Sequence, residues 1–228
     1  MRIGVIADIH SNLAALKAVL RDMPRVDKII CAGDLVGYAA EPNEVVELAQ
    51  RKKILSVLGD HDNSSSIGDV KRYDSIAAQA ITWTFENLEE GNKKHLRNLP
   101  RKLDLKIGGG RILVVHGSPR DPLFDCVFPD ISNHALLDLV KGVDADIVVL
   151  GHTHIPMKRV IHGKLIINPG SVGQPRDRDP RASYMVLRIN GDMEVEHKKV
   201  DYEINETAEK IKSAGLPEEL AVRLYFGW

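Results

Sequence analysis

Aspartate and histidine recur in this sequence where short apolar runs end, and five such ends carry one or both residues. Carboxylate oxygens and imidazole nitrogens are ligands that suit borderline divalent ions such as manganese, iron, nickel or zinc. Asp after Gly at a strand end also forms turns and caps, so one such residue by itself predicts little. The recurrence favours a metal site formed from the residues at these ends, which are Asp8, His10, Asp34, Asp60, His61, Asp62, His116, His152 and His154.

Two of the groups have the same spacing, Asp8-x-His10 and His152-x-His154. In an extended segment alternate side chains point to the same face. The spacing therefore predicts that both members of each pair face one shared metal site.

The elements that must position these residues follow an α/β pattern, in which apolar runs alternate with helical periodicity. In the first third we expect strands over residues 3–7, 28–32 and 54–58, a helix capped by Ser11 and a helix that begins at Pro42. Ligand sites of open α/β sheets form at the carboxyl ends of the strands. The Asp and His residues should therefore converge.

The rest of the chain is richer in predicted strands. A helix over residues 73–87 precedes a hairpin of residues 103–107 and 111–115, with Gly108–Gly110 as its turn. Two helical segments close the chain, and no linker rich in Pro, Gly or Ser divides it, so we expect one domain over residues 1–228. Further strands are expected over residues 147–150, 157–161, 165–167, 183–189 and 194–200, with turns at Gly163 and Asn190-Gly191.

Composition narrows the class of protein. The 31 basic and 32 acidic residues among 228 give a formal charge of -1, so no basic face is expected for long nucleic acids. Cys31 lies in an apolar run and Cys126 in a polar loop, which is typical of a reducing compartment, and we expect a cytoplasmic protein. The apolar stretch after Met1 is too short for a signal or spanning segment, so no membrane association is expected.

The order of the motifs resembles the calcineurin-like metallophosphoesterases, and within them the small single-domain phosphodiesterases of bacteria and archaea. The resemblance extends from Ile3 to about Asp177, and it implies an α/β fold, a four-layer α/β/β/α sandwich of two mixed β-sheets. The motifs that carry it are Asp8-x-His10, Gly33-Asp34, Gly59-Asp60-His61-Asp62, His116, Gly151-His152-Thr153-His154 and the turn Asn168-Pro169-Gly170-Ser171.

The resemblance also implies a metal centre with two divalent ions, manganese in first place and iron, nickel or zinc as alternatives. The ions would activate a shared hydroxide as the nucleophile on a phosphate ester. The implied first ion is bound by Asp8, His10 and His154, the bridging ligand is Asp34, and the second ion is bound by Asp60, His116 and His152.

Two further roles follow from the same resemblance. His61 would contact the substrate phosphate or protonate the leaving oxygen, and Asp62 would orient the His61 ring. Independently of the resemblance, Arg176, Arg178 and Arg181 could bind a phosphate or an acidic leaving group, with Arg176 as the candidate, although a solvated loop of alternating charges is the alternative. Tyr38 either faces the cleft or packs against Pro42.

One position departs from the family pattern, because Asp60 stands where the family usually has asparagine. A carboxylate adds negative charge and lacks the amide donor. Three carboxylates and a hydroxide would cancel the charge of two divalent ions. We therefore expect Asp60 to slow turnover or to shift the preference toward a more highly charged metal such as ferric iron.

The expected function is metal-dependent hydrolysis of a small-molecule phosphate ester, with a phosphodiester favoured. A nucleotide pyrophosphohydrolase or a protein phosphatase would use the same site. The family also contains a non-catalytic binding scaffold, so that alternative stays open, as does a homo-oligomer.

Overall fold

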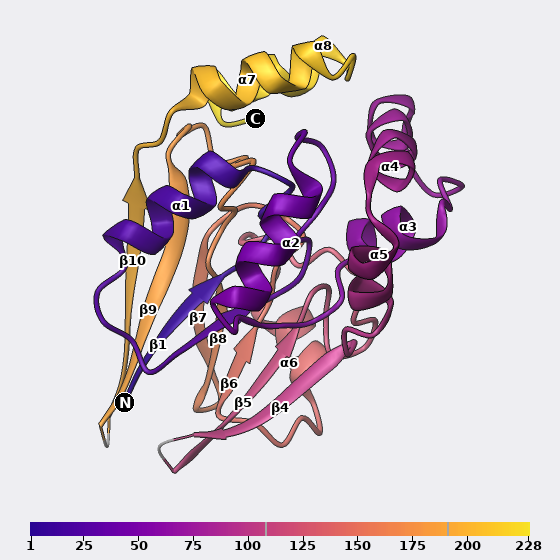
Figure 1. The fold of residues 1–228 in the computed structure, drawn as a ribbon. Coiled ribbons are helices and arrows are strands. Elements are labelled where there is room, and N and C mark those ends of the chain that lie inside the picture. The colour runs from indigo at the N-terminus through magenta and orange to yellow at the C-terminus, as the bar shows by residue number, and fades with distance from the viewer. Residues whose placement is uncertain (108, 191) are drawn as a thin grey trace.

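Among the described residues, which are all except 108 and 191 in this computed structural model, the strands form two five-stranded mixed sheets (Figure 1). Sheet A has the order β10-β9-β1-β2-β3, and sheet B has the order β4-β5-β6-β8-β7. Sheet A contains β1 (Arg2–Ile6), β2 (Lys28–Cys31), β3 (Leu55–Ser56), β9 (Ala182–Asn190) and β10 (Asp192–Val200). Sheet B contains β4 (Lys102–Ile107), β5 (Gly110–Val115), β6 (Ile147–Val149), β7 (Met157–Ile161) and β8 (Lys164–Asn168).

Parallel pairing of three strands in each sheet brings several carboxyl ends to one edge. In sheet A, β1 is parallel to β2, which is parallel to β3. In sheet B, β5, β6 and β8 are parallel neighbours. In sheet A the strands β9 and β10 pair antiparallel with their neighbours, and in sheet B so do the edge strands β4 and β7.

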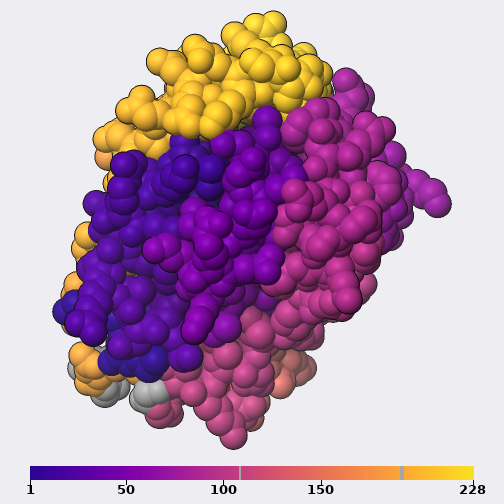
Figure 2. Space-filling model, in the orientation of Figure 1, coloured from indigo at the N-terminus to yellow at the C-terminus, as the bar shows by residue number. Residues whose placement is uncertain are grey.

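The helices cover both sheets and one end of the molecule. The described helices are α1 (Leu13–Asp22), α2 (Pro42–Arg51), α3 (Asp60–Ile67), α4 (Ser75–Asn87), α5 (Glu90–Arg97), α6 (Asn133–Val140), α7 (Ile204–Ser213) and α8 (Glu218–Phe226). The carboxyl-terminal α7 and α8 lie across the end of the molecule where the loops after β1 and β2 emerge, and they meet α4 there (Figures 1 and 2).

Three apolar cores confirm the expected four layers. Val5 of sheet A and Val149 of sheet B belong to the core between the sheets. Leu16 of α1 packs on the outer face of sheet A, and Leu136 of α6 packs with Val148 on the outer face of sheet B. Because alternate residues of a strand face opposite sides of its sheet, the short apolar run of one strand supplies side chains to two cores.

Most of the predicted strands are confirmed, with differences at the ends. The third strand is shorter than expected, and Asn12 rather than Ser11 caps α1, because the Asn12 side chain accepts the Ala15 N–H at 3.0 Å. The Ser11 hydroxyl instead accepts the Gly37 N–H. The hairpin of β4 and β5 is confirmed, while the parts of the expected turns at 108 and 191 lie outside the described residues.

The helices α3, α5 and α6 were not predicted. The α3 sequence DHDNSSSI has almost no apolar periodicity, so the pattern that reveals a surface helix is missing. No helix in the described part of the chain is long and apolar enough to cross a membrane.

Candidate metal centre

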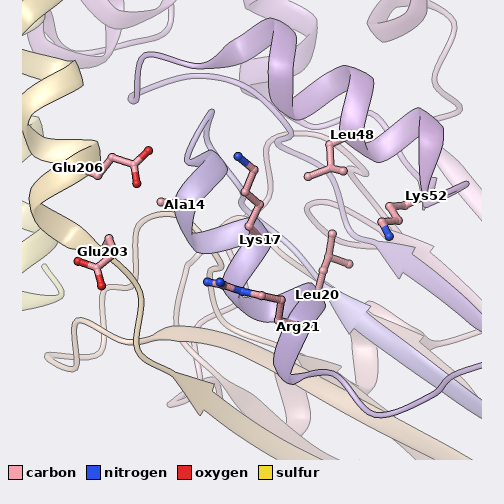
Figure 3. Close-up of a pocket in the computed structure, with 8 residues that line it drawn as sticks. All are labelled: Ala14, Lys17, Leu20, Arg21, Leu48, Lys52, Glu203 and Glu206. Carbon is pink, nitrogen blue, oxygen red and sulfur yellow. The ribbon is translucent and has the colours of Figure 1, made fainter.

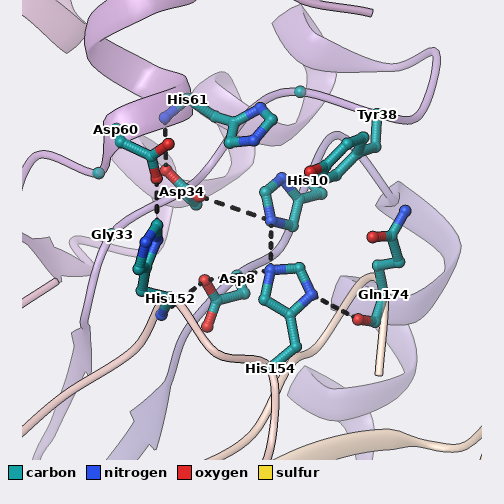
Figure 4. A network of polar contacts seen from close by, with 12 residues as sticks. Asp8, His10, Gly33, Asp34, Tyr38, Asp60, His61, His152, His154 and Gln174 are labelled. Carbon is teal, nitrogen blue, oxygen red and sulfur yellow. Dashed lines mark hydrogen bonds and ion pairs between the residues drawn. The ribbon is translucent and has the colours of Figure 1, made fainter. Parts of the chain in front are cut away.

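The predicted Asp and His ligands meet where loops leave β1, β2, β5 and β6, together with the first residue of α3 (Figure 4). All except His152, which is partly exposed, are buried. Most of them have left-handed backbone conformations, which cost energy in residues other than glycine and concentrate at functional sites. The positive φ angles are 54° at Asp8, 48° at His10, 55° at Asp34, 68° at His152 and 59° at His154.

The prediction that both members of each pair face one shared site is wrong for His152 and His154. His152 and His154 lie on different sides of the centre, His152 beside His116 and His154 beside His10. The two-residue alternation holds only for extended backbone, and the backbone at both of these histidines is left-handed, so their side chains need not share a face. The chain therefore forms two ligand sets.

The first set consists of Asp8, His10 and His154. The Nε2 atoms of the two histidines are 3.0 Å apart, and Asp8 Oδ1 is 3.6 Å from His154 Nε2. The three ligand atoms lie close enough together to surround one ion.

The second set consists of Asp60, His116 and His152. Asp60 Oδ1 is 3.0 Å from His116 Nε2 and 3.1 Å from His152 Nδ1, and the two nitrogens are 3.1 Å apart. This set also has the spacing of ligands to one ion.

Asp34 lies between the two sets. Its Oδ2 atom is 3.5 Å from His10 Nε2 in the first set and 3.4 Å from His116 Nε2 in the second. Its Oδ1 atom accepts the backbone N–H of His61 at 3.0 Å, which fixes the orientation of the carboxylate. One oxygen of Asp34 is therefore directed at both sets.

Backbone carbonyls orient three of the histidine rings. The Nδ1 atoms of His10, His116 and His154 lie 3.1, 2.7 and 2.6 Å from the carbonyl oxygens of Val36, Ala32 and Gln174, respectively. With Nδ1–H donated outward, each Nε2 presents a lone pair to the centre. Two such lone pairs face each other at 3.0 Å between His10 and His154, an arrangement that a cation between them would stabilise.

Buried carboxylate oxygens without hydrogen-bond partners also indicate that the centre binds cations. Within the described part of the chain, Asp8 Oδ2 and Asp34 Oδ2 accept no hydrogen bond. An unsatisfied buried polar atom is costly, and a bound ion is one of the ordinary ways in which proteins satisfy such an atom. The donor set and its unpaired oxygens thus fit two divalent cations.

The electrostatics show how strongly burial and mutual repulsion act here. Burial lowers the pKa of His10 to about 3 and raises the pKa of Asp8 to about 7, with Asp34 adding to the Asp8 shift. Burial opposes protonation of His116, but the carboxylates, Asp34 first, outweigh it and raise the His116 pKa well above its ordinary value. The carboxylates therefore favour positive charge at His116 Nε2, which a proton or a metal ion would supply.

His61 lies next to the centre, but Asp62 does not orient its ring as expected. The Asp62 carboxylate accepts the N–H of Val36 at 3.0 Å and the N–H of Gly59 at 3.2 Å. Consecutive residues on a helix do not face each other, so Asp62 points away from the His61 ring. Asp62 instead ties the start of α3 to the loop after β2, and His61 Nδ1 has no partner among the described residues.

Arg176 and Tyr38 lie together at the rim of the centre. The Arg176 guanidinium donates to the Tyr38 hydroxyl at 3.2 Å and to Gln174 Oε1 at 3.1 Å. The Tyr38 ring is 4.6 Å from the His10 ring and 4.4 Å from the His61 ring. Of the two alternatives for Tyr38, the structure shows the one that faces the site.

The turn that begins at Asn168 supports the histidine loop. The Asn168 amide donates to the carbonyl oxygen of Gly151 at 2.7 Å and to the Thr153 hydroxyl at 3.1 Å. Asn168 is fully buried, so its contribution is to hold the backbone that carries the two histidines.

A cavity of about 360 Å³ opens onto the second ligand set and His61. Three of its lining residues, Arg72, Tyr73 and Phe124, were missed by the sequence analysis because they do not follow strands and belong to no motif. They come from the α3–α4 connection and from the loop after β5, and only the packing of those segments reveals them. A second groove, of about 410 Å³ between α1, α2 and the start of α7, contains none of the ligands (Figure 3).

Comparison with known proteins agrees with this geometry. Residues 1–192 match the model of the calcineurin-like phosphoesterase superfamily domain. An uncharacterized protein of Methanocaldococcus jannaschii is 38% identical over 99% of this chain and 98% of its own length. A probable metallophosphoesterase of Methanothermobacter thermautotrophicus is 29% identical over 91% of this chain and 93% of its own.

A solved structure shows that the likeness extends to the whole fold. The crystal structure of a metallophosphoesterase from Sphaerobacter thermophilus superposes with a TM-score of 0.88 and 35% identity, covering 100% of this chain and 99% of that one. The family match, the relatives and the fold all agree with the Asp and His centre. The chain therefore belongs to the calcineurin-like phosphoesterase superfamily.

Proposed function

We propose that this protein hydrolyses a small-molecule phosphodiester with a dinuclear metal centre. The observation that carries the proposal is the position of Asp34 Oδ2, 3.5 and 3.4 Å from ligand nitrogens of two separate sets. Two adjacent ions require a carboxylate oxygen that both can bind. Among the described residues Asp34 Oδ2 accepts no hydrogen bond, so the contacts there give it no structural role.

The proposed ligands are those that the sequence predicted. Asp8, His10 and His154 would hold the first ion, and Asp34 would bridge the two ions. The second ion would be held by the second set, which is Asp60, His116 and His152. Two bound divalent ions, with manganese as the first choice and iron, nickel or zinc as alternatives, would lower the pKa of a shared water and neutralise charge on the phosphate. The carbonyl-bound Nδ1–H groups keep His10, His116 and His154 in the tautomer that ligation through Nε2 needs.

Two side chains are proposed to act on the substrate. His61 lines the cavity beside the second ligand set, so its imidazole is placed to contact the phosphate or to protonate the leaving oxygen. Asp62 would act on His61 only indirectly, by holding the first turn of α3. Arg176 lies at the rim with its guanidinium held by Tyr38, where it would bind a phosphate oxygen.

The size and charge of the site favour a small substrate. A cavity of about 360 Å³ has room for a compact ester, and the formal charge of -1 offers a polymeric nucleic acid no excess of cations. Both cysteines are free, which supports a cytoplasmic location.

The test combines metal content with hydrolysis. We expect the purified protein, after incubation with Mn²⁺, to contain two ions per chain and to cleave bis-p-nitrophenyl phosphate faster than p-nitrophenyl phosphate. A dinucleoside polyphosphate and a phosphopeptide in the same panel test the pyrophosphohydrolase and protein phosphatase alternatives. A folded protein that binds no metal and cleaves none of these esters would support the scaffold alternative.

A further inference from the structure

Tyr73, in the connection between α3 and α4, directs its phenol oxygen at Asp60. That oxygen is 2.9 Å from Asp60 Oδ2, 3.0 Å from the Asp60 carbonyl oxygen and 2.9 Å from the Ser64 hydroxyl. The other carboxylate oxygen, Oδ1, faces the two histidines of the second set. The two oxygens of Asp60 thus have separate partners.

This division bears on the departure of position 60 from the family pattern. An amide offers one ligand oxygen and a neutral donor group, whereas a carboxylate offers two acceptor oxygens and a negative charge. The phenol has one proton to donate, and the ionised Oδ2 is a stronger acceptor than the Asp60 carbonyl oxygen, because hydrogen bonds to an ionised acceptor are about twice as strong as neutral ones. Donated to Oδ2, this proton satisfies the second carboxylate oxygen. The phenol therefore leaves Asp60 with a single free oxygen, as an asparagine would have.

We propose that Tyr73 is a positioning residue that holds Asp60 with Oδ1 alone directed at the second metal ion. The inference rests on the proposed dinuclear function. It assigns Tyr73 the task of making an aspartate serve where the family usually has asparagine.

Packing fixes the Tyr73 phenol in this position. Its ring packs against the apolar cluster that α4 forms with α7 and α8, and it meets the His61 ring edge-on at 5.2 Å. Its backbone N–H donates to the Val70 carbonyl, and the next residue, Asp74, caps α4. The carboxyl-terminal helices thereby help to set the geometry of a metal ligand far from them in sequence.

A purely structural role for Tyr73 is the competing explanation, because its contact with Ser64 also joins the α3–α4 connection to α3. The two roles differ in what they depend on. A structural role would not depend on whether residue 60 carries a charge. If Tyr73 orients the carboxylate, removing its hydroxyl should weaken binding of the second ion more with Asp60 present than with an asparagine in its place.

The experiment is a double-mutant cycle read by calorimetric titration of the metal-free full chain with Mn²⁺, without substrate. We expect Tyr73→Phe to weaken the second ion about 10-fold or more, the usual effect of removing a partner of a metal ligand, and to leave the first ion unchanged. In the Asp60→Asn background the same substitution should cost less than about 3-fold, because a neutral amide loses a weaker hydrogen bond.

Two matched variants serve as controls. Tyr184→Phe removes a comparable phenol–carboxylate hydrogen bond, to Asp22, elsewhere in the fold, and should not change Mn²⁺ affinity. Ser64→Ala removes the other side-chain partner of the Tyr73 phenol and should leave the second ion bound within about 3-fold, since Asp60 keeps its donor.

The outcomes separate this inference from the proposed function. A parent chain that binds no Mn²⁺ overturns the dinuclear proposal itself. A parent that binds two ions, with second-ion affinity unchanged by Tyr73→Phe or weakened equally in both backgrounds, overturns the role of Tyr73 alone. If Tyr73→Phe does not fold, a loss of the second ion in folded Ser64→Ala would likewise contradict it.

Discussion

Asp34→Asn is the substitution that tests the shared-ligand geometry most directly. The asparagine keeps an oxygen that can accept the His61 N–H, so the loop after β2 should retain its shape. What disappears is the negative charge of Oδ2, which lies 3.5 and 3.4 Å from the nitrogens of the two sets. Both ions should therefore bind more weakly at the same time.

The size of the effect follows from binding linkage. An ion present at 100 times its dissociation constant stabilises the fold by about 2.7 kcal/mol, so two ions contribute about 5.4 kcal/mol. For a chain of this length each kcal/mol raises the melting temperature by about 2–4 °C, which gives a rise of about 10–20 °C. Partners that only orient ligands are worth up to about 100-fold in affinity, and we expect at least that for a direct shared ligand.

At the same Mn²⁺ concentration, a 100-fold loss leaves about 0.4 kcal/mol per ion, or a rise of only about 2–3 °C in total. Thermal melts with Mn²⁺ and with EDTA, together with metal content by mass spectrometry, measure this directly. Asp104→Asn, which removes a surface partner of Arg111, is the control and should keep the full rise. The reasoning is refuted if Asp34→Asn still binds two ions with the parent's thermal shift.

Three further predictions concern individual side chains. Asp60→Asn should raise turnover of bis-p-nitrophenyl phosphate because it removes a negative charge that repels the substrate; unchanged or lower turnover would contradict this. His61→Gln should lower kcat by about 10²–10⁴-fold while two ions stay bound, and a drop in metal content would instead make it a ligand. Burial, reinforced by Lys199, lowers the pKa of the His197 imidazole, while two nearby aspartates oppose the shift. The unfolded chain therefore binds the proton first, so stability should fall as pH drops below about 6.5. Urea unfolding at pH 8 and pH 5.5 should show a smaller loss for His197→Gln, and equal losses would refute the assignment.

Much of the fold could be read from the sequence because each strand is a short apolar run that ends in a polar residue. The strands of both sheets were predicted to within two residues at each end, and β3 is proportionally the most shortened. α3 escaped prediction because its first turn consists of Asp60, His61 and Asp62, which are present for the site and not for an apolar face. Local patterns reveal elements that bury one side, and they say little about elements that carry ligands.

The residue types of the site could likewise be read from the sequence, because carboxylates and imidazoles at strand ends indicate their own chemistry. The grouping of the ligands came only from the family resemblance, because residue spacing by itself placed His152 and His154 at one shared site. The opposite directions of His152 and His154 depend on left-handed backbone, and the turning away of Asp62 depends on a helix that has no sequence signature.

By itself the sequence determined which groups are available to bind metal and the parallel strands whose ends bring them together. The tertiary structure alone decided that Asp34 faces both sets, that carbonyls select the histidine nitrogens, and that Tyr73 meets Asp60. The physical reason is that these contacts join segments from different layers of the fold. Their geometry follows from how the sheets and helices pack against one another, which no local spacing of residues encodes.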